Sequence, residues 1–447
     1  MGYPFVSSLT SQLNRRHLLR VGAVSTAVSM SGWLGKLAQA AEDTNTKTKR
    51  SCILLWMSGG PSTIDMWDLK PDHQNGGPYR QVNTTAPGLR IGEHLPRLAM
   101  HGNRLAILRG MSTKEGDHAR GTYLMRTGQL PSAAGIQYPS IGALLSKELG
   151  DPKAELPNFI SIAPQRFFSQ EAFGPGFLGP IHAPLIVGES QNFNNPMGNG
   201  IDSILKVADL ERPKSIDEST AAVRLEMLRD MQDEFASTRP GQMPKSHAAA
   251  YDRAIRLMQS AGGKVFDLTE EKPETRDKYG RNLFGQGCLL ARRLVERGVP
   301  FIEVTLGGWD THQQNFDLVK NLCRTLDAAW GSLMDDLKDR GLLDTTTIVW
   351  MGEFGRTPII NQSRGRDHFP NAWSTVIAGG GVKGGQAIGK TSKDGMTVEE
   401  RVTPTLDLLA TVCSVLGIDF EKTNPSNVGR PIRIVDKGAN PIKEVIA

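Results

Sequence analysis

The sequence has few cysteines, with only Cys52, Cys288, Cys323 and Cys413 among 447 residues. None of them forms a C-x-x-C pair, and each lies within an apolar stretch. This spacing does not demand a disulfide, even in a compartment that permits one. We therefore expect the four side chains to lie in the core.

The sequence also lacks a long block of basic residues. The formal net charge is +5, but lysine and arginine are spread along the chain. A nucleic-acid-binding surface needs clustered basic side chains, usually with aromatics among them. The sequence therefore predicts that nucleic acid is not a partner.

No apolar run is strong enough to span a membrane. The run from Val21 to Leu37 contains serine, glycine and Lys36, and a span needs about 20 predominantly apolar residues. No second candidate follows it. We therefore expect no transmembrane anchor.

The N-terminus has the features of an export signal instead. Arg15 and Arg16 form a twin-arginine pair before the apolar run, and Ala38 and Ala40 frame a small-x-small cleavage site. The pattern predicts a signal peptide over residues 1–40, a polar linker over 41–50, and a periplasmic or secreted protein exported by the twin-arginine pathway. The alternative is an uncleaved amphipathic helix.

The rest of the chain is long enough for one large α/β domain over residues 51–447. It has 39% hydrophobic residues, 48 glycines and 26 prolines. Residues from about 200 to 280 are charged and helical in pattern, which indicates an inserted helical subdomain. Strands are predicted over 52–57, 105–109, 159–162, 185–187, 301–306 and 346–351, and helices over 141–149, 221–235, 282–295 and 404–416.

Polar side chains follow two of these predicted strands directly. Asp310 and His312 follow the predicted strand 301–306, and Glu353 and Arg356 follow the predicted strand 346–351. Asp367 and His368 lie on the next loop. In open α/β sheets ligands gather at the carboxyl ends of strands. Carboxylates mixed with imidazoles suit a divalent cation better than a covalent triad. The alternative is that these charges only solvate their loops.

Two further segments offer groups to a bound anion or metal. Ser62 ends a glycine turn after the first strand, where free N–H groups and a hydroxyl suit an anion, and Asp65 follows as a candidate extra ligand. A tight turn that needs glycine is the alternative for the turn itself. His118 and Arg120 are expected at a helix N-terminus, which favours an anionic ligand.

A phosphate-loop pattern, G-x-x-x-x-G-K-[ST], occurs from Gly384 to Thr391. Its mechanism needs a preceding strand and a helix that begins at the lysine. The residues after it, Ser392 to Gly395, break a helix. We therefore expect a loop or hairpin over 379–390 and no nucleotide.

Three longer segments carry a resemblance to a known superfamily. The run from Leu326 to Gly355 is similar to the sulfatase segment in which a helix and a turn lead into a metal-binding strand end. The runs from Arg120 to Ser140 and from Thr403 to Leu409 resemble two further sulfatase motifs in matching order. The chain therefore resembles the alkaline phosphatase/sulfatase superfamily. Within it, the GGWDTH, GEFGRTP and RRLVERGVPF segments resemble the exported bacterial family called domain of unknown function 1501.

The resemblance implies an alkaline-phosphatase-like fold, with a mostly parallel central sheet flanked by helices. It also implies one or two divalent metals (zinc, calcium or magnesium) at the strand ends. Asp310, His312, Glu353 and His368 match family ligands, with Asp367 and Asp65 as further candidates. Two positions depart from the pattern. Phe354 stands where the family has a histidine, and Asp117 or His118 stands where it has a Ser, Thr or Cys nucleophile.

The function expected is metal-dependent hydrolysis of a sulfate or phosphate ester, with a sulfated polysaccharide among the candidate substrates. Arg120 and Arg356 would hold the ester oxygens, although Arg356 could instead pair with Glu353 and Asp367 could only orient His368. His118 would act as general acid/base or as a nucleophile. The rival is a catalytically degenerate binding protein for anionic glycans or a cell-surface partner, and a weaker third option is a phosphomutase-like activity.

Overall fold

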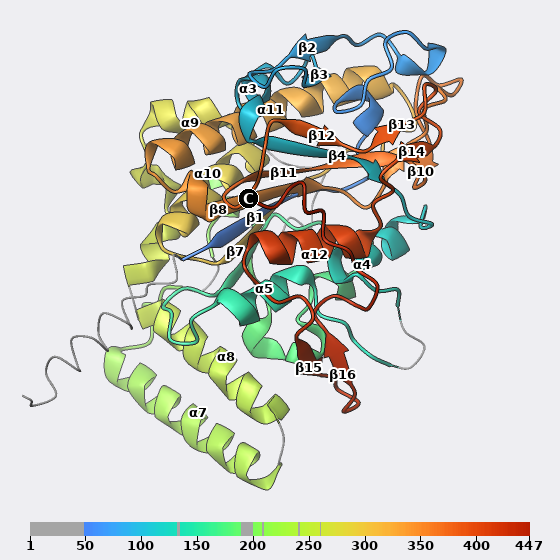
Figure 1. The fold of residues 1–447 in the computed structure, drawn as a ribbon. Coiled ribbons are helices and arrows are strands. Elements are labelled where there is room, and N and C mark those ends of the chain that lie inside the picture. Colours follow the sequence, from blue (N-terminus) through green and yellow to red (C-terminus); the bar gives the residue numbers. More distant parts are fainter. Residues whose placement is uncertain (1–48, 132–134, 189–199, 208–209, 240–241, 260) are drawn as a thin grey trace, which may run out of the picture. The chain divides into compact units, whose positions relative to one another are not determined.

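An eight-stranded sheet forms the centre of the molecule (Figure 1). The computed structural model describes residues 49–447, except 132–134, 189–199, 208–209, 240–241 and 260. The predicted signal peptide therefore lies outside the described residues. In spatial order the strands are β12 (Gln386–Ile388), β4 (Leu105–Met111), β11 (Trp373–Gly379), β8 (Thr346–Met351), β1 (Ser51–Met57), β7 (Phe301–Leu306), β5 (Phe159–Ile162) and β6 (Leu185–Val187).

The sheet is parallel except for one strand. β1 pairs in parallel with β7 and β8, and β5 pairs in parallel with β7 and β6. β11 runs antiparallel to both of its neighbours, β4 and β8. The mostly parallel α/β fold expected from the sequence is confirmed. The parallel strands therefore present their carboxyl ends at one common edge.

Both faces of β1 are buried, which explains its unbroken apolar sequence. Ile53, Leu55 and Met57 pack into a core with helices α10 (Leu283–Glu296) and α11 (Asn315–Asp339). Leu54 and Trp56 pack on the opposite face with α5 (Ile141–Leu149) and α12 (Thr405–Val415). The helices thus form a layer on each side of the sheet (Figure 1).

Most remaining elements lie around this centre. The short helices are α3 (Pro96–Met100), α4 (His118–Thr127), α6 (Ile201–Ile204) and α9 (Pro273–Tyr279). The two-stranded sheets are β2 (Gln81–Asn83) with β3 (Arg90–Gly92), β9 (Gly355–Arg356) with β10 (His368–Phe369), β13 (Lys390–Thr391) with β14 (Val398–Glu400), and β15 (Thr423–Pro425) with β16 (Pro431–Arg433). Of these, the β9–β10 ribbon has a direct part in the site described below.

Two longer helices stand apart from the sheet. α7 (Glu218–Thr238) lies alongside α8 (Gln242–Gln259), and α7 has no buried residue (Figure 1). The predicted helix over 221–235 lies within α7. An inserted helical subdomain over about 200–280 remains our interpretation of this segment.

The glycine-rich segment 379–390 differs from the sequence prediction. It is not a simple loop or hairpin, because β12 adds to the sheet edge in parallel with β4. Lys390 begins the short strand β13, so the helix that a phosphate loop needs is missing at that position. No helix among the described residues is long and apolar enough to cross a membrane. The four cysteines are buried, as expected, and in this structure none of them forms a disulfide.

Candidate metal centre

Three imidazoles and one carboxylate meet at the carboxyl edge of the sheet. Asp310 and His312 follow β7, His368 begins β10, and His118 begins α4. Asp117 caps α4, because its side chain accepts a hydrogen bond from the N–H of Arg120 at 3.0 Å. The cap therefore fixes where the helix starts and places His118 in its first turn.

The Asp310 carboxylate is the centre of the cluster. Its Oδ1 lies 3.0 Å from Nε2 of His312 and 3.3 Å from Nε2 of His368. Its Oδ2 lies 3.4 Å from Nε2 of His118. The Nε2 atoms of His312 and His368 are themselves 3.0 Å apart. Three ring nitrogens thus converge on one carboxylate.

The other nitrogen of each ring faces an acceptor. Nδ1 of His118 lies 2.7 Å from Oε1 of Glu353. Nδ1 of His368 lies 2.7 Å from the backbone oxygen of Gly116. Nδ1 of His312 lies 2.8 Å from Oδ1 of Asp367. A carbonyl or carboxylate oxygen can only accept, so each Nδ1 carries the hydrogen.

This arrangement leaves the Nε2 lone pairs pointing inward. In a neutral imidazole only one nitrogen carries hydrogen, so the Nε2 atoms of His118, His312 and His368 are acceptors. They face an acceptor carboxylate and, for two of them, each other. Outer-sphere carboxylates and carbonyls that fix imidazoles in this way are typical of histidine metal ligands. A cation bound between these Nε2 atoms would pair with their inward lone pairs.

Protonation of His118 is a second way to place positive charge in the cluster. Burial would raise the pKa of Asp310, but His118, His368 and Arg356 hold it well below its usual range. Burial would lower the pKa of His118, but the adjacent carboxylates Asp310 and Glu353 raise it to about 9. The site thus stabilises positive charge at its centre.

Two buried atoms at this site also lack hydrogen-bond partners among the described residues. They are Nε2 of His118 and Oε2 of Glu353. Buried polar atoms are rarely left unpaired without a functional reason. Together with Asp310 and His368, His118 offers ligand atoms that all lie within 4.8 Å of one another. The residues present therefore fit a divalent cation.

The turn after β1 packs directly against Asp310, the residue at the centre of the cluster. Gly59 has φ of +110°, and a Cβ on it would lie 2.5 Å from the backbone nitrogen of Asp310. Only glycine allows both this conformation and this approach. The buried Arg356 donates to the backbone oxygens of Gly59 and Gly60 and to the Asp310 carboxylate. Arg356 thus fastens Asp310 to the turn.

Arg356 and Glu353 therefore play parts other than those suggested by sequence. Arg356 also donates to the backbone oxygen of Arg366 at 3.2 Å, and its side chain is fully buried. Its donors are thus used within the protein, and it pairs with Asp310 rather than with Glu353. Glu353, interpreted from sequence as a metal ligand, accepts from the N–H of Gly59 at 2.8 Å and faces Nδ1 of His118. Both contacts use Oε1, whereas Oε2 has no hydrogen-bond partner among the described residues.

Two other candidates also change role. Asp367 was a candidate extra ligand, with orientation of His368 as the alternative, and its carboxylate faces His312. The hydrogen bond from His312 lowers the pKa of Asp367. Arg120, expected to hold ester oxygens, is exposed and pairs with Glu115 at 2.7 and 2.9 Å. These contacts favour a structural role for Arg120.

Ser62 and Asp65 belong to a separate buried network. Both oxygens of Asp65 accept from Arg366 at 2.9 Å. Its Oδ2 also accepts from Ser62 Oγ at 2.6 Å and from Asn315 at 2.8 Å. These contacts use the Ser62 hydroxyl and the Asp65 carboxylate within the network itself. The network joins the turn after β1 to the chain leading into β10.

Aromatic rings enclose two of the imidazoles. Phe168 stacks on His118 with ring centroids 4.3 Å apart and planes at 15°. Phe354 lies 5.0 Å from the His118 ring and 4.8 Å from the His368 ring. In the sequence, Phe354 stood out only because it replaces a histidine of the family pattern. Phe168 was not a candidate. No local pattern marks Phe168, because its contact with His118 spans distant parts of the chain.

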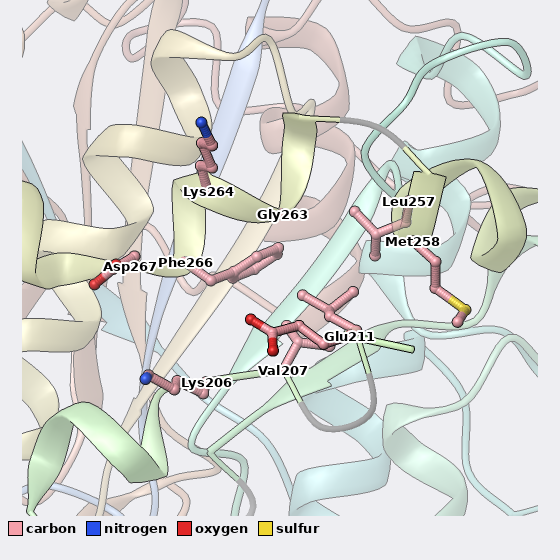
Figure 2. Close-up of a pocket in the computed structure, with 10 residues that line it drawn as sticks. Lys206, Val207, Glu211, Leu257, Met258, Gly263, Lys264, Phe266 and Asp267 are labelled. Atoms are coloured by element: carbon pink, nitrogen blue, oxygen red, sulfur yellow. The ribbon is translucent and has the colours of Figure 1, made fainter. Parts of the chain in front are cut away.

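A separate cavity of about 600 Å³ lies beside α8 and the segment after it (Figure 2). Its lining mixes Lys206, Glu211 and Asp267 with Leu257 and Met258. Phe266 is directed towards the side where Leu257 and Met258 lie. Among the described residues, those that line it include neither histidine nor cysteine. The chemistry therefore concentrates at the carboxyl edge of the sheet.

Comparison with family models gives one match, over residues 49–446, to "Protein of unknown function (DUF1501)". The chain belongs to this family. The membership expected from the GGWDTH and GEFGRTP segments is thus confirmed. No curated protein matches the chain.

Several solved structures are similar to this DUF1501 chain at low identity. The lipoteichoic acid synthase LtaP from Listeria monocytogenes is 11% identical, with a TM-score of 0.39, over 90% of this chain and 77% of that one. The sulfatase PsFucS1 from Pseudoalteromonas sp. is 13% identical, with a TM-score of 0.38, over 85% and 70%. A protein in the alkaline phosphatase superfamily from Vibrio parahaemolyticus is 13% identical, with a TM-score of 0.37, over 83% and 67%.

Proposed function

We propose that this DUF1501 protein is a metal-dependent hydrolase of sulfate or phosphate esters. The observation that carries the proposal is the convergence of three Nε2 atoms on Asp310, with each Nδ1 atom held by an acceptor. A cation bound between them would satisfy acceptors brought together in this way. The motif resemblance to sulfatases supports the ester class. The twin-arginine segment supports a reaction outside the cytoplasm.

The ligand set favours zinc among the candidate divalent metals. His118, His312 and His368 would offer three nitrogens, and Asp310 would offer one oxygen. Zinc accepts such mixed nitrogen and oxygen sets, whereas calcium and magnesium prefer oxygen ligands. Glu353 and Asp367 would act as outer-sphere partners. They would accept hydrogen bonds from Nδ1 of His118 and His312 and so keep these two rings oriented towards the metal.

When bound, a divalent cation supplies Lewis-acid chemistry and lowers the pKa of water. The protein's own side chains set the conditions for this. Asp310 contributes negative charge while Arg356 keeps its carboxylate in place. Phe168 and Phe354 exclude water from one side of His118. The exposed side chains of Asp310 and His312 leave the opposite side open to an ester.

Water is the nucleophile that this site supports best. Ser62 is fully buried and its hydroxyl donates to Asp65. Both nitrogens of His118 face carboxylates, so a phosphohistidine-type role is disfavoured. We therefore propose direct attack by water on the sulfur or phosphorus atom, with release of the alcohol. A phosphomutase-like reaction would need a covalent phosphoryl intermediate and is not supported by these contacts.

The test measures metal and turnover together in the purified full chain. Elemental analysis should find zinc, and a panel of nitrophenyl sulfate, phosphate and phosphodiester should reveal hydrolysis that a chelator abolishes. His118→Ala and His368→Ala should lose both metal and turnover. The matched control is His247→Asn, because His247 is exposed on α8 next to Tyr251 and outside the cluster.

The outcomes separate the proposal from its rival. Turnover that survives the chelator and both alanine substitutions would overturn the metal-dependent mechanism. Retained metal with no turnover on any ester would favour the alternative of a degenerate binding protein for anionic glycans or a cell-surface partner. The departure at His118 from the family nucleophile is the observation that keeps this alternative open.

A further inference from the structure

The side-chain amide of Asn361 contacts the most exposed of the three clustered histidines, His312. Its Nδ2 atom lies 3.0 Å from the backbone oxygen of His312 and 3.2 Å from Oδ1 of Asp367. The same Asp367 oxygen faces Nδ1 of the His312 ring at 2.8 Å. One amide group thus bridges the backbone of His312 and the carboxylate that orients its ring.

The orientation of this amide follows from its partners. Oδ1 of Asn361 accepts from the N–H groups of Ser363 and Gly365 at 3.0 and 2.9 Å. Nδ2 faces a carbonyl oxygen and a carboxylate oxygen, which can only accept. Exchange of the two amide atoms would place acceptors against acceptors and donors against donors. Asn361 therefore uses its oxygen to close its own loop and its N–H groups to hold the neighbouring segment.

The loop that contains this amide runs along the segment that carries His312. The N–H of Gln314 donates to the backbone oxygen of Ser363 at 3.1 Å. Gln314 and Arg364 both have positive φ, of 48° and 56°. An added Cβ on Gly365 would lie 1.8 Å from the backbone oxygen of His312. Strained non-glycine residues persist only where surrounding contacts enforce them, so the two segments fix each other's backbone.

The His312 ring is the least supported by burial of the three imidazoles. Its side chain is 42% exposed, against 12% for His118 and 27% for His368. The side chain of its carboxylate partner, Asp367, is 55% exposed. A solvent-exposed pair contributes little by itself, because the entropy lost in ordering two side chains offsets most of the attraction. A third group that holds both members reduces this entropic cost.

We propose that Asn361 is a positioning residue for the metal centre, which holds the Asp367–His312 pair so that Nε2 of His312 points into the cluster. This inference rests on the proposed hydrolase function and adds a residue to its site. Asn361 acts through His312, because its amide reaches the backbone and the partner of that residue rather than a ring nitrogen. Without the amide, the His312 ring turns out of the cluster for part of the time. The site then depends on the remaining three ligand atoms, which lie within 4.8 Å of one another.

Asn361→Ser separates the two roles of the amide. The serine hydroxyl can still accept from nearby backbone N–H groups, but its side chain is too short to hold both His312 and Asp367. Heteronuclear NMR of the histidine rings in chelator-treated protein reports the tautomer of each ring, and His312→Gln assigns the signal. We expect His312 to carry its hydrogen on Nδ1 in wild type and to average both tautomers in Asn361→Ser. An unchanged His312 signal would overturn the proposal.

A double-mutant cycle measures the same effect on metal binding. In competition with a chromogenic chelator, Asn361→Ser should weaken zinc binding about tenfold, at the low end for outer-sphere substitutions. In the His312→Ala background the same substitution should change zinc affinity by less than about twofold, because the ring through which it acts is missing. Equal losses in both backgrounds, or no loss in either, would overturn the proposal.

The matched control is Asn158→Ser. Asn158 is also half-buried, and its Nδ2 atom donates to the backbone oxygen of Asp151 at 3.0 Å, but it precedes β5 at the opposite end of the sheet. It should leave the His312 signal and the zinc affinity unchanged. Asn361→Asp is a second variant for the NMR test. It keeps the oxygen that closes the loop but sets a carboxylate against Asp367, so it should also release the ring.

The NMR test keeps this inference separate from the hydrolase proposal, because it needs neither metal nor turnover. Failure of the hydrolase proposal would appear in the wild-type chain, as absent zinc and absent turnover. Failure of the positioning role would appear as a His312 ring that is equally ordered in wild type, Asn361→Ser and Asn361→Asp.

Discussion

The Nε2 atoms of His312 and His368 face each other at 3.0 Å, and both lie against Oδ1 of Asp310. When both Nδ1 atoms carry the hydrogens, neither Nε2 atom can donate a hydrogen bond to the other or to Asp310. A cation that binds here and not to the unfolded chain stabilises the fold by about 2.7 kcal/mol at one hundred times its dissociation constant. We therefore expect added zinc to raise the unfolding temperature after chelator treatment. Calorimetry on wild type and on His312→Ala/His368→Ala tests this, and an equal rise in both would contradict it.

Glu353→Gln should weaken the metal centre without removing a ligand. The amide oxygen can still accept from Gly59, but the negative charge that orients and polarises His118 is lost. Outer-sphere substitutions of this kind cost about 10–100-fold in metal affinity or activity. Competition with a chromogenic chelator measures the affinity. Asp367→Asn provides the parallel case at His312, and unchanged affinity in both variants would remove Glu353 and Asp367 from the outer sphere.

Asp65→Asn should destabilise the protein strongly. It leaves the fully buried Arg366 guanidinium without its carboxylate partner. Loss of one member of a buried pair typically costs about 3–5 kcal/mol. Denaturant unfolding of the metal-free protein measures this cost apart from metal binding. A loss below about 1 kcal/mol would show that the network is not structural.

Arg120→Ala should change little, in contrast to the catalytic role that its position suggested. Its guanidinium is exposed, and its partner Glu115 lies on the loop just before α4. Exposed ion pairs contribute about 0–1 kcal/mol to stability. We expect kcat/KM within about threefold of wild type on the nitrophenyl esters. A drop of a hundredfold or more would restore Arg120 as a substrate-binding residue.

His182 should make the fold sensitive to acid. Burial, together with Lys147 and Arg253, lowers the pKa of His182 to about 4. Because this value lies below that of the unfolded chain, its contribution is complete above about pH 6.5 and is lost as the pH falls towards 4. The loss is at most about 3 kcal/mol. Chelator-treated His182→Gln should show a shallower fall in unfolding free energy between pH 6.5 and 4, and identical slopes would contradict the assignment.

Local sequence patterns predicted much of the framework. The runs 301–306 and 346–351 became β7 and β8 with those bounds, because both runs are rich in β-branched and apolar residues, which favour strands. The rule that ligands gather at strand ends then brought Asp310, His312 and His368 together. The placement of these three residues at one edge of the sheet followed from the fold and did not require knowledge of individual side-chain contacts.

The role of each side chain within the cluster could not be predicted from the sequence. Whether a carboxylate binds a cation or orients an imidazole depends on contacts between distant segments. Glu353 meets His118 across 235 positions of the chain, and Asp65 meets Arg366 across 301. A motif fixes the type of side chain at a strand end, but the direction of that side chain depends on the neighbours it packs against. For the same reason, β12 joined the sheet edge although its sequence suggested only a loop.

The strand order has a consequence for how the two ends of the chain depend on each other. The strands before the α7–α8 hairpin are β1, β4, β5 and β6, and those after it are β7, β8, β11 and β12. Five of the seven pairings in the sheet join a strand from one group to a strand from the other. Neither fragment of a chain cut at the hairpin could therefore build the sheet by itself. His118 and Asp310 fall on opposite sides of that cut, so zinc uptake by mixed fragments would report their reassembly.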